Sequence, residues 1–258
     1  MRLKSSISIH TDWIPRHARS PAAGILAGLL LSACGSGGGS RSFPIPSPQG
    51  SYDLQAGMAA LLQSGLSTNV NLSGTAIVSG TSNPFTGTGT LTLSPGVGGM
   101  FNGMMARLQS QSISGTVSVA GQTSPYSSSV VNAYEPAATA VLGESQSTEF
   151  DVAQQPIMIP TMVGTSVTML GTLSRYTDST LSVALGTVQV SVAVVLIPID
   201  PGSNEVVQFT YKVFDTSQAL VQTDNISYVL TENNLLSFYS AATQSASGTL
   251  TVTPQLAQ

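Results

Sequence analysis

From Asn71 onwards, apolar side chains tend to recur at every second position of the chain, which is the period of a β-strand. In residues 187–197 every even position is apolar, and the odd positions change from polar to apolar toward the end. Such a strand begins at a surface and ends in an interior. No stretch after residue 66 has a helical period, so the sequence predicts an all-β, mainly antiparallel fold.

Turn-forming residues divide the later part of the chain into alternating segments. The predicted strands, joined as a meander, are 187–197, 205–214, 219–230, 235–241 and 247–253. The expected architecture is a β-sandwich or a strongly curved meander sheet. Only 8% of the residues are charged, against roughly 25% in an average domain, so serine, threonine, asparagine and glutamine must cover the outer faces.

A weak repeat lies in the first half of the β-rich part. Residues 72–85 align without gaps to residues 113–126, with six identical positions among fourteen. Each copy combines a glycine, an alternating segment and a proline followed by an aromatic residue. We interpret this as a duplicated hairpin over 72–93 and 113–134, in which each proline marks a turn, within a single domain over 51–258.

One short helix is expected before the strands. Asp53 is a suitable N-cap and Gly65 a suitable end. The apolar residues between them follow the spacing of one helical face: Leu54, Met58, Leu61 and Leu62. The helix lacks the Lys/Arg-rich polar face of a membrane-surface helix, so we expect it to pack on the sheet.

The start of the chain has the pattern of a secretory signal peptide. Residues 22–33 form an uncharged, mainly apolar run that follows the cations Arg2, Lys4, Arg16 and Arg19. A spanning helix needs about 20 apolar residues, so this run is too short to remain in a membrane as a helix. We expect residues 1–33 to be removed.

The end of that run, Leu31-Ser32-Ala33-Cys34, resembles the lipobox of bacterial lipoproteins. The resemblance implies cleavage before Cys34 and attachment of lipid to its sulfur and its new amine, so that Cys34 connects the chain to a membrane. Gly35 stands where an aspartate would favour the inner membrane, which implies the outer membrane, facing either the periplasm or the surface. A Gly/Ser/Pro-rich linker follows up to residue 50. The alternative is ordinary secretory cleavage that leaves a free cysteine.

Processing would remove much of the catalytic chemistry available to the chain. His10, His17 and Trp13 all precede the cleavage point, and Cys34, the one cysteine, would carry lipid. Without imidazole or thiol, Ser-His-Asp, Cys-His and His/Cys zinc sites are excluded. Because only four cations would remain, binding to nucleic acid and to anionic lipid through a basic patch is excluded as well.

Carboxylates are the remaining candidates for catalysis or metal binding. Glu149 and Asp151 are two residues apart and would share one face of a strand, as in a two-carboxylate glycosidase. Acids at this spacing are common on polar strand faces, and Glu144 nearby suggests a solvated acidic loop. Two oxygen-rich turns could bind calcium, although ordinary turns explain them better: Asp200 with Asn204 and Glu205, and Asp224-Asn225 with Glu232. We expect no metal and no cofactor.

Methionine and tyrosine have both a functional and a structural interpretation. Thioethers can bind Cu(I), but without histidine or a tight cluster they more often fill gaps in a core. The methionines in question are Met100, Met104, Met105, Met158, Met162 and Met169. Exposed tyrosines could stack on sugars, whereas Tyr211 and Tyr228 alternate with apolar neighbours and are expected at half-buried strand positions.

Three functions are compatible with these observations. The first is a non-enzymatic binding or scaffold module, anchored to the outer membrane through Cys34, with a protein or glycan partner left open. The second is a carboxylate-dependent enzyme that acts on polysaccharide through Glu149 and a second acid. The third is a carrier that holds an apolar ligand in a cavity formed by the sheet.

Overall fold

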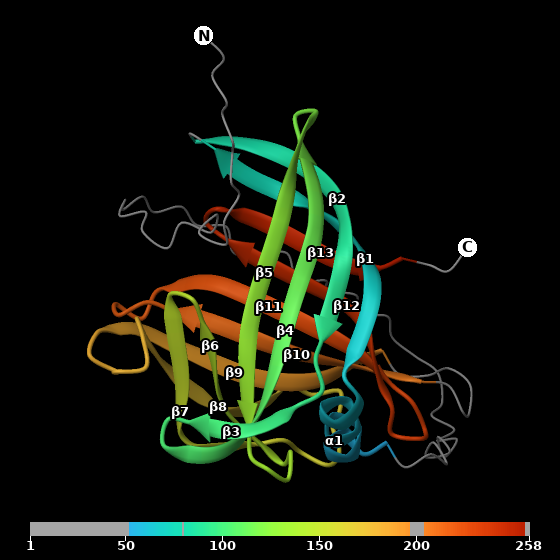
Figure 1. The fold of residues 1–258 in the computed structure, drawn as a ribbon, viewed down its shortest axis with the longest axis vertical. Helices are drawn as coiled ribbons and strands as arrows, with labels where there is room; N and C mark the ends of the chain where they lie inside the picture. Colours follow the sequence, from blue (N-terminus) through green and yellow to red (C-terminus); the bar gives the residue numbers. More distant parts are fainter. Residues whose placement is uncertain (1–51, 79, 197–203, 256–258) are drawn as a thin grey trace, which may run out of the picture.

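The computed structural model describes residues 52–78, 80–196 and 204–255. It contains one helix, α1 (Leu54–Ser64), followed by strands only (Figure 1). The strands are β1 (Leu66–Val78), β2 (Thr81–Leu93), β3 (Val97–Phe101), β4 (Met104–Val119), β5 (Gln122–Tyr134), β6 (Ala140–Gln146), β7 (Glu149–Met158), β8 (Thr168–Tyr176), β9 (Ala184–Leu196), β10 (Glu205–Phe214), β11 (Leu220–Leu230), β12 (Leu236–Ser245) and β13 (Gly248–Pro254). The predicted all-β antiparallel fold with one short helix is confirmed.

All strands belong to one antiparallel sheet, and that sheet closes on itself. The order runs from β2 through β1 and β13 down to β4 and β3, and β2 also pairs with β4. The closed part is a barrel of 12 strands, with β3 as an additional strand beside β4 (Figure 1). The expected sandwich is therefore wrong, because the same sheet supplies every wall around the core.

The pairing that closes the barrel depends on two glycines. Gly89 of β2 stands directly opposite Gly115 of β4. A Cβ atom on Gly115 would lie 2.1 Å from the carbonyl oxygen of Thr88 and 2.5 Å from the Cα atom of Gly89. The two backbones can approach this closely only because neither residue has a side chain.

Helix α1 covers one end of the barrel. A side-chain oxygen of Asp53 accepts a hydrogen bond from the backbone N–H of Ala56 at 2.9 Å, which is the expected N-cap. The backbone N–H of Asp53 in turn donates to Oδ1 of Asn234, in the β11–β12 turn. Leu54 and Leu62 are fully buried in the largest cluster of apolar residues, which we call the main core. In this core α1 packs against strands from opposite sides of the barrel. Among the described helices none is both long and apolar enough to cross a bilayer.

Each copy of the repeat forms an antiparallel hairpin, β1–β2 and β4–β5. The predicted proline turns are wrong, because Pro84 lies within β2 and Pro125 within β5. The two hairpins instead turn at Gly80 and Gly121, which have φ angles of 78° and 79°.

Both prolines lie where their strand has only one partner. Pairing between β2 and β4 begins at Phe85, one residue after Pro84. Pairing between β5 and β6 begins at Val131, well after Pro125. A missing N–H group costs little where no strand lies on that side, so each proline is accommodated within a strand.

A second, smaller core lies on the outside of the barrel. The hairpin of β3 and the start of β4 folds over the outer face of β5 to β7 (Figure 1). Phe101 of β3 is 5% exposed and stacks on Phe150 of β7, with 4.7 Å between ring centroids. The other buried members are Ala106, Ala133, Leu142 and Val152.

Candidate functional site: the interior of the barrel

The inward-facing side chains change in burial along the barrel. Near α1 they are buried and form the main core, as at Leu72, Val207 and Phe238. Toward the opposite end the burial is mixed, because Ala76, Phe85 and Val117 are still buried in the main core whereas five other inward-facing apolar side chains pack against it and stay partly exposed. These five are Ile113, Tyr126, Ile226, Ala241 and Leu250. Among the described residues no helix covers this end.

The strand registers place these side chains on one continuous wall. Leu250 stands beside Gly74 of β1 and Thr243 of β12. Ile226 stands beside Phe209, which is buried in the main core. The accessible wall is therefore continuous with the filled half of the barrel, and it mixes apolar side chains with hydroxyl groups.

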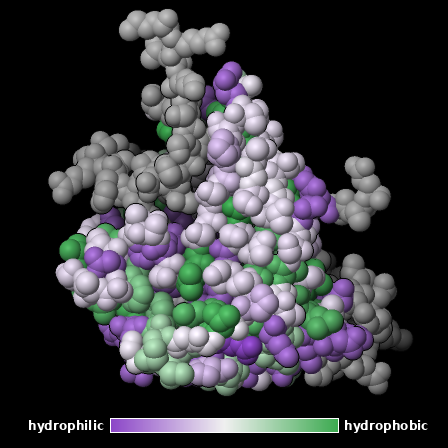
Figure 2. Space-filling view, in the orientation of Figure 1, coloured by the Kyte–Doolittle hydropathy of each residue, from purple (hydrophilic) through white to green (hydrophobic). Residues whose placement is uncertain are grey.

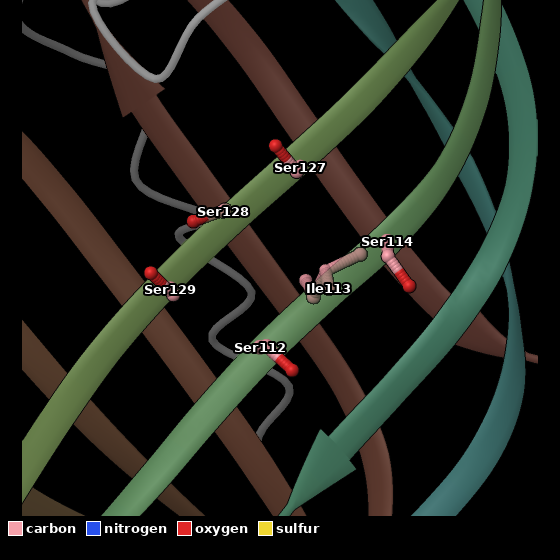
Figure 3. A pocket seen from close by; sticks show the side chains of 6 residues that line it. All are labelled: Ser112, Ile113, Ser114, Ser127, Ser128 and Ser129. Atoms are coloured by element: carbon pink, nitrogen blue, oxygen red, sulfur yellow. The ribbon is translucent and has the colours of Figure 1, made fainter.

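A shallow, open depression of about 180 Å³ lies along β4 and β5, next to Ile113 of this wall. Its lining consists of uncharged residues only: Ser112, Ile113, Ser114, Ser127, Ser128 and Ser129. Figure 3 shows that Ile113 projects from β4 to the side opposite Ser112 and Ser114. Because no lining residue is ionisable, the depression has no acid, base or activated nucleophile, and its chemistry is limited to hydrogen bonding and apolar contact.

The candidate carboxylates Glu149 and Asp151 point into the barrel and are joined to one arginine. Nε of Arg175 donates to Oδ1 of Asp151 at 3.1 Å, and Nη2 of Arg175 donates to Oε2 of Glu149. The exposed fractions are 4% for Glu149, 1% for Asp151 and 7% for Arg175. The expected solvated acidic loop is therefore wrong, because β7 turns both acids toward the interior. A buried carboxylate is costly unless a cation pairs with it, and Arg175 supplies that cation here.

The ion pair belongs to a polar row that crosses four strands. Asp151 stands opposite Arg175 of β8 on one side and Glu144 of β6 on the other, and Glu144 stands opposite Asn132 of β5. Glu144 and Asp151 lie side by side because β6 and β7 form a hairpin in this register. A substrate would have to enter the barrel to reach Glu149 or Asp151.

Three tyrosines of the barrel have a raised pKa, and one of them, Tyr134, lies on β5 two residues from Asn132 of the polar row. Burial raises the pKa of Tyr228 to about 12. Burial also raises the pKa of Tyr134 and of Tyr211, with further contributions from the neighbouring tyrosines and from the Glu144 carboxylate. Tyr211 stands opposite Asp224 in the β10–β11 register, which places a carboxylate beside this tyrosine.

We expect alkali to destabilise the fold through these tyrosines. Their folded-state pKa lies above the unfolded value of about 10, so the folded protein keeps their protons after the unfolded chain has lost them. Their contribution is complete below that pH and is lost as the pH rises through the folded pKa. Urea unfolding between pH 9 and about 12 should show falling stability, and Tyr228→Phe should make the fall less steep. An equal slope in the variant would contradict this assignment.

The other predicted metal sites do not come together in the described part of the chain. Asp224 and Asn225 are neighbours on β11 and project to opposite faces, with Asp224 opposite Tyr211 and Asn225 bonded to Thr210. Glu232 lies beyond the end of that strand. Among the described residues no group of three or more histidine, cysteine, aspartate or glutamate side chains is arranged to hold a metal ion. Asp200 lies outside the described residues, as do Leu31, Ser32, Ala33 and Cys34.

The methionines contradict the expectation that they fill a core. Six of them are exposed at the surface, and only Met58 is in the main core. The exposed fractions are 58% for Met100, 37% for Met104, 67% for Met105, 56% for Met158, 81% for Met162 and 57% for Met169. Residue type alone does not separate a buried from an exposed methionine, although the Asn102-Gly103 turn between Met100 and Met104 indicated a protruding hairpin.

Comparison with known proteins leaves the family open. No protein-family model matches the chain, and no curated protein matches it. Two solved structures are similar over most of their length. An outer membrane lipoprotein-sorting protein domain from Vibrio parahaemolyticus has a TM-score of 0.28 and 11% identity, over 79% of this chain and 90% of that one. A DUF1329 family protein from Desulfovibrio piger has a TM-score of 0.26 and 9% identity, over 77% and 89%. TM-scores this low do not establish a common fold.

Proposed function

We propose that this chain is a lipid-anchored, non-enzymatic binding protein of the outer membrane that holds the apolar part of an amphiphilic ligand inside its barrel. The ligand would occupy the half of the interior opposite α1. The observation that carries the proposal is the partly exposed apolar inner wall, formed by Ile113, Tyr126, Ile226, Ala241 and Leu250. A group of apolar side chains that lines a concave surface is a candidate binding site for an apolar ligand.

The anchor in this proposal comes from the sequence. The motif Leu31-Ser32-Ala33-Cys34 would attach the chain to the bilayer, because several acyl chains at about 0.8 kcal/mol per buried CH₂ hold a protein there stably. The interior supports binding rather than catalysis, since Glu149 and Asp151 are held by Arg175 in the described structure. An amphiphile suits the wall because hydroxyl and carboxylate groups lie beside the apolar ones.

Binding can be measured with the fluorescent apolar probe N-phenyl-1-naphthylamine and the mature full chain. We expect probe fluorescence to rise on addition of the protein, and a long-chain fatty acid to reverse the rise by competition. Leu250→Glu should weaken probe binding by about tenfold or more, because it places a charge on the apolar inner wall. Thr251→Glu on the outer face of the same strand is the matched control and should bind as the unmodified chain does.

Two outcomes would contradict the proposal. One is a folded, unmodified chain that produces no rise in probe fluorescence. The other is a Leu250→Glu variant that melts as the unmodified chain does and still binds the probe equally well. A second variant, Ile113→Trp, fills the space without adding charge and should lower the number of bound probe molecules.

A further inference from the structure

We propose that the hairpin of residues 97–105 is a membrane-contact element, which lays Met100 and Met105 on the bilayer surface to which the chain is anchored. We call it the methionine hairpin. The proposal rests on the lipid anchor proposed above and adds a second contact, which would fix the orientation of the barrel relative to the membrane.

The methionine hairpin presents an apolar surface to solvent. Met100 and Met105 are cross-strand partners in the β3–β4 register, so their side chains share one face. They are 58% and 67% exposed. Val97 is also exposed, at 62%, but it lies on the other face of β3, the face of Phe101. Apolar residues also gather over this hairpin in the space-filling view (Figure 2). A group of large apolar side chains that is left exposed marks a contact surface.

The opposite face of the methionine hairpin is fixed to the barrel. Phe101 is buried against Phe150, and Ala106 is 3% exposed in the same outer core. Met104 stands opposite Phe101 on this packed face, which explains its lower exposure of 37%. The hairpin is therefore held in place with Met100 and Met105 outward, and no rearrangement is needed to present them.

The charge pattern favours a lipid surface as the occupant. Between Asp53 and Glu135 the sequence contains one charged residue, Arg107. Nε of Arg107 donates to the backbone carbonyl of Gly96, so its side chain is directed toward the loop before β3. Residues 97–105 carry no charge, so burying the hairpin itself in a bilayer would remove no charge of its own from water. Thioether side chains also adapt readily to irregular apolar surroundings.

The described chain begins at the same end of the barrel as the methionine hairpin. Residues 35–51 connect Cys34 to Tyr52, which immediately precedes the cap of α1. The other end of α1 contacts the hairpin, because the backbone N–H of Gly96 donates to the carbonyl of Leu62 at 2.7 Å. An α1 of 11 residues is about 16 Å long, so Tyr52, where the described chain begins, lies about one helix length from the loop that enters the hairpin (Figure 1).

Insertion can be measured with single tryptophans, because the only tryptophan, Trp13, is removed with the signal peptide. The variants are Met105→Trp and, as a control, Ile77→Trp, at an exposed apolar position near the hairpin turn at the opposite end of β1. Each lipidated full chain is placed in vesicles of phosphatidylethanolamine and phosphatidylglycerol. We expect brominated lipids to quench Met105→Trp by about twofold or more and to leave Ile77→Trp unchanged. Equal quenching at both positions, or none at Met105→Trp, would overturn the proposal.

A second measurement separates the hairpin from the anchor. In the Cys34→Ser background the chain carries no lipid, and flotation with the same vesicles reports the hairpin alone. Met100→Ser with Met105→Ser should reduce flotation about fivefold, independent of salt, while Ile77→Ser should not change it. If mass spectrometry finds no lipid on Cys34 of the unmodified chain but flotation is retained, the anchor is refuted and the hairpin remains as the membrane contact. Loss of a dimer in the double variant, without loss of flotation, would instead identify the hairpin as an interface between copies.

Discussion

Arg175→Met should lower the free energy of unfolding by about 3–5 kcal/mol. Glu149, Asp151 and Arg175 are all less than one-tenth exposed, and the guanidinium bonds to both carboxylates. Removing the cation leaves two carboxylates facing each other in the interior of the barrel. The cost comes from the uncompensated charges rather than from the lost volume, because methionine is of similar size to the apolar part of arginine.

Urea unfolding of the mature chain measures this effect. Lys212→Met is the matched control, since Lys212 is exposed on β10 and its substitution should change stability by less than about 0.5 kcal/mol. The triple change Glu149→Gln, Asp151→Asn and Arg175→Met should recover much of the loss, because it removes every charge of the network. Equal stability of Arg175→Met and Lys212→Met would show that the ion pair is not formed in solution.

Gly115→Ala should destabilise the fold by about 3 kcal/mol through a different cause, namely steric overlap at the pairing that closes the barrel. The added Cβ would lie 2.1 Å from the carbonyl oxygen of Thr88 and 2.5 Å from the Cα atom of Gly89, and both of these atoms belong to backbone. Backbone cannot move aside as a flexible side chain can, so β2 and β4 must separate locally and lose hydrogen bonds. Probe binding should fall as well, because these two strands form one wall of the interior.

Gly98→Ala provides the control for this change. Gly98 also lies in a strand, but a Cβ atom there would meet nothing within 4 Å. Its substitution should be neutral or slightly stabilising, because alanine restricts the unfolded chain more than glycine does. A Gly115→Ala variant as stable as Gly98→Ala would mean that β2 and β4 are not paired in solution and that the barrel is open there.

The meander was predictable because its segments are rich in apolar residues at alternate positions and are bounded by turn residues. The predicted segment 205–214 coincides with β10, and 219–230 differs from β11 by one residue. The helix was predictable because Asp53 and Gly65 mark both ends of one apolar face. In each case the information is local, so a single sequence contains it.

The features that were missed depend on contacts between distant parts of the chain. Closure requires β2 to meet β4 after β3 has been placed outside the barrel, and the alternation of neither strand specifies its partner. Glu149 and Asp151 resemble surface acids in sequence, because the cation that allows their burial lies 26 and 24 residues away. The methionine hairpin has a defined outer face because Phe101 packs against Phe150. No local pattern in the sequence indicates that contact.

The pairing of β1 with β13 also governs when this protein can fold. Gln255 reaches back to the carbonyl of Val70 across 185 positions, and Val70 itself stands opposite Pro254. A ribosome must therefore release the chain as far as β13 before β1 can pair with its second neighbour, and loop closure over such distances is slow. The barrel consequently stays open throughout most of the synthesis of residues 66–254, and β1 is an unpaired edge on that side until β13 arrives.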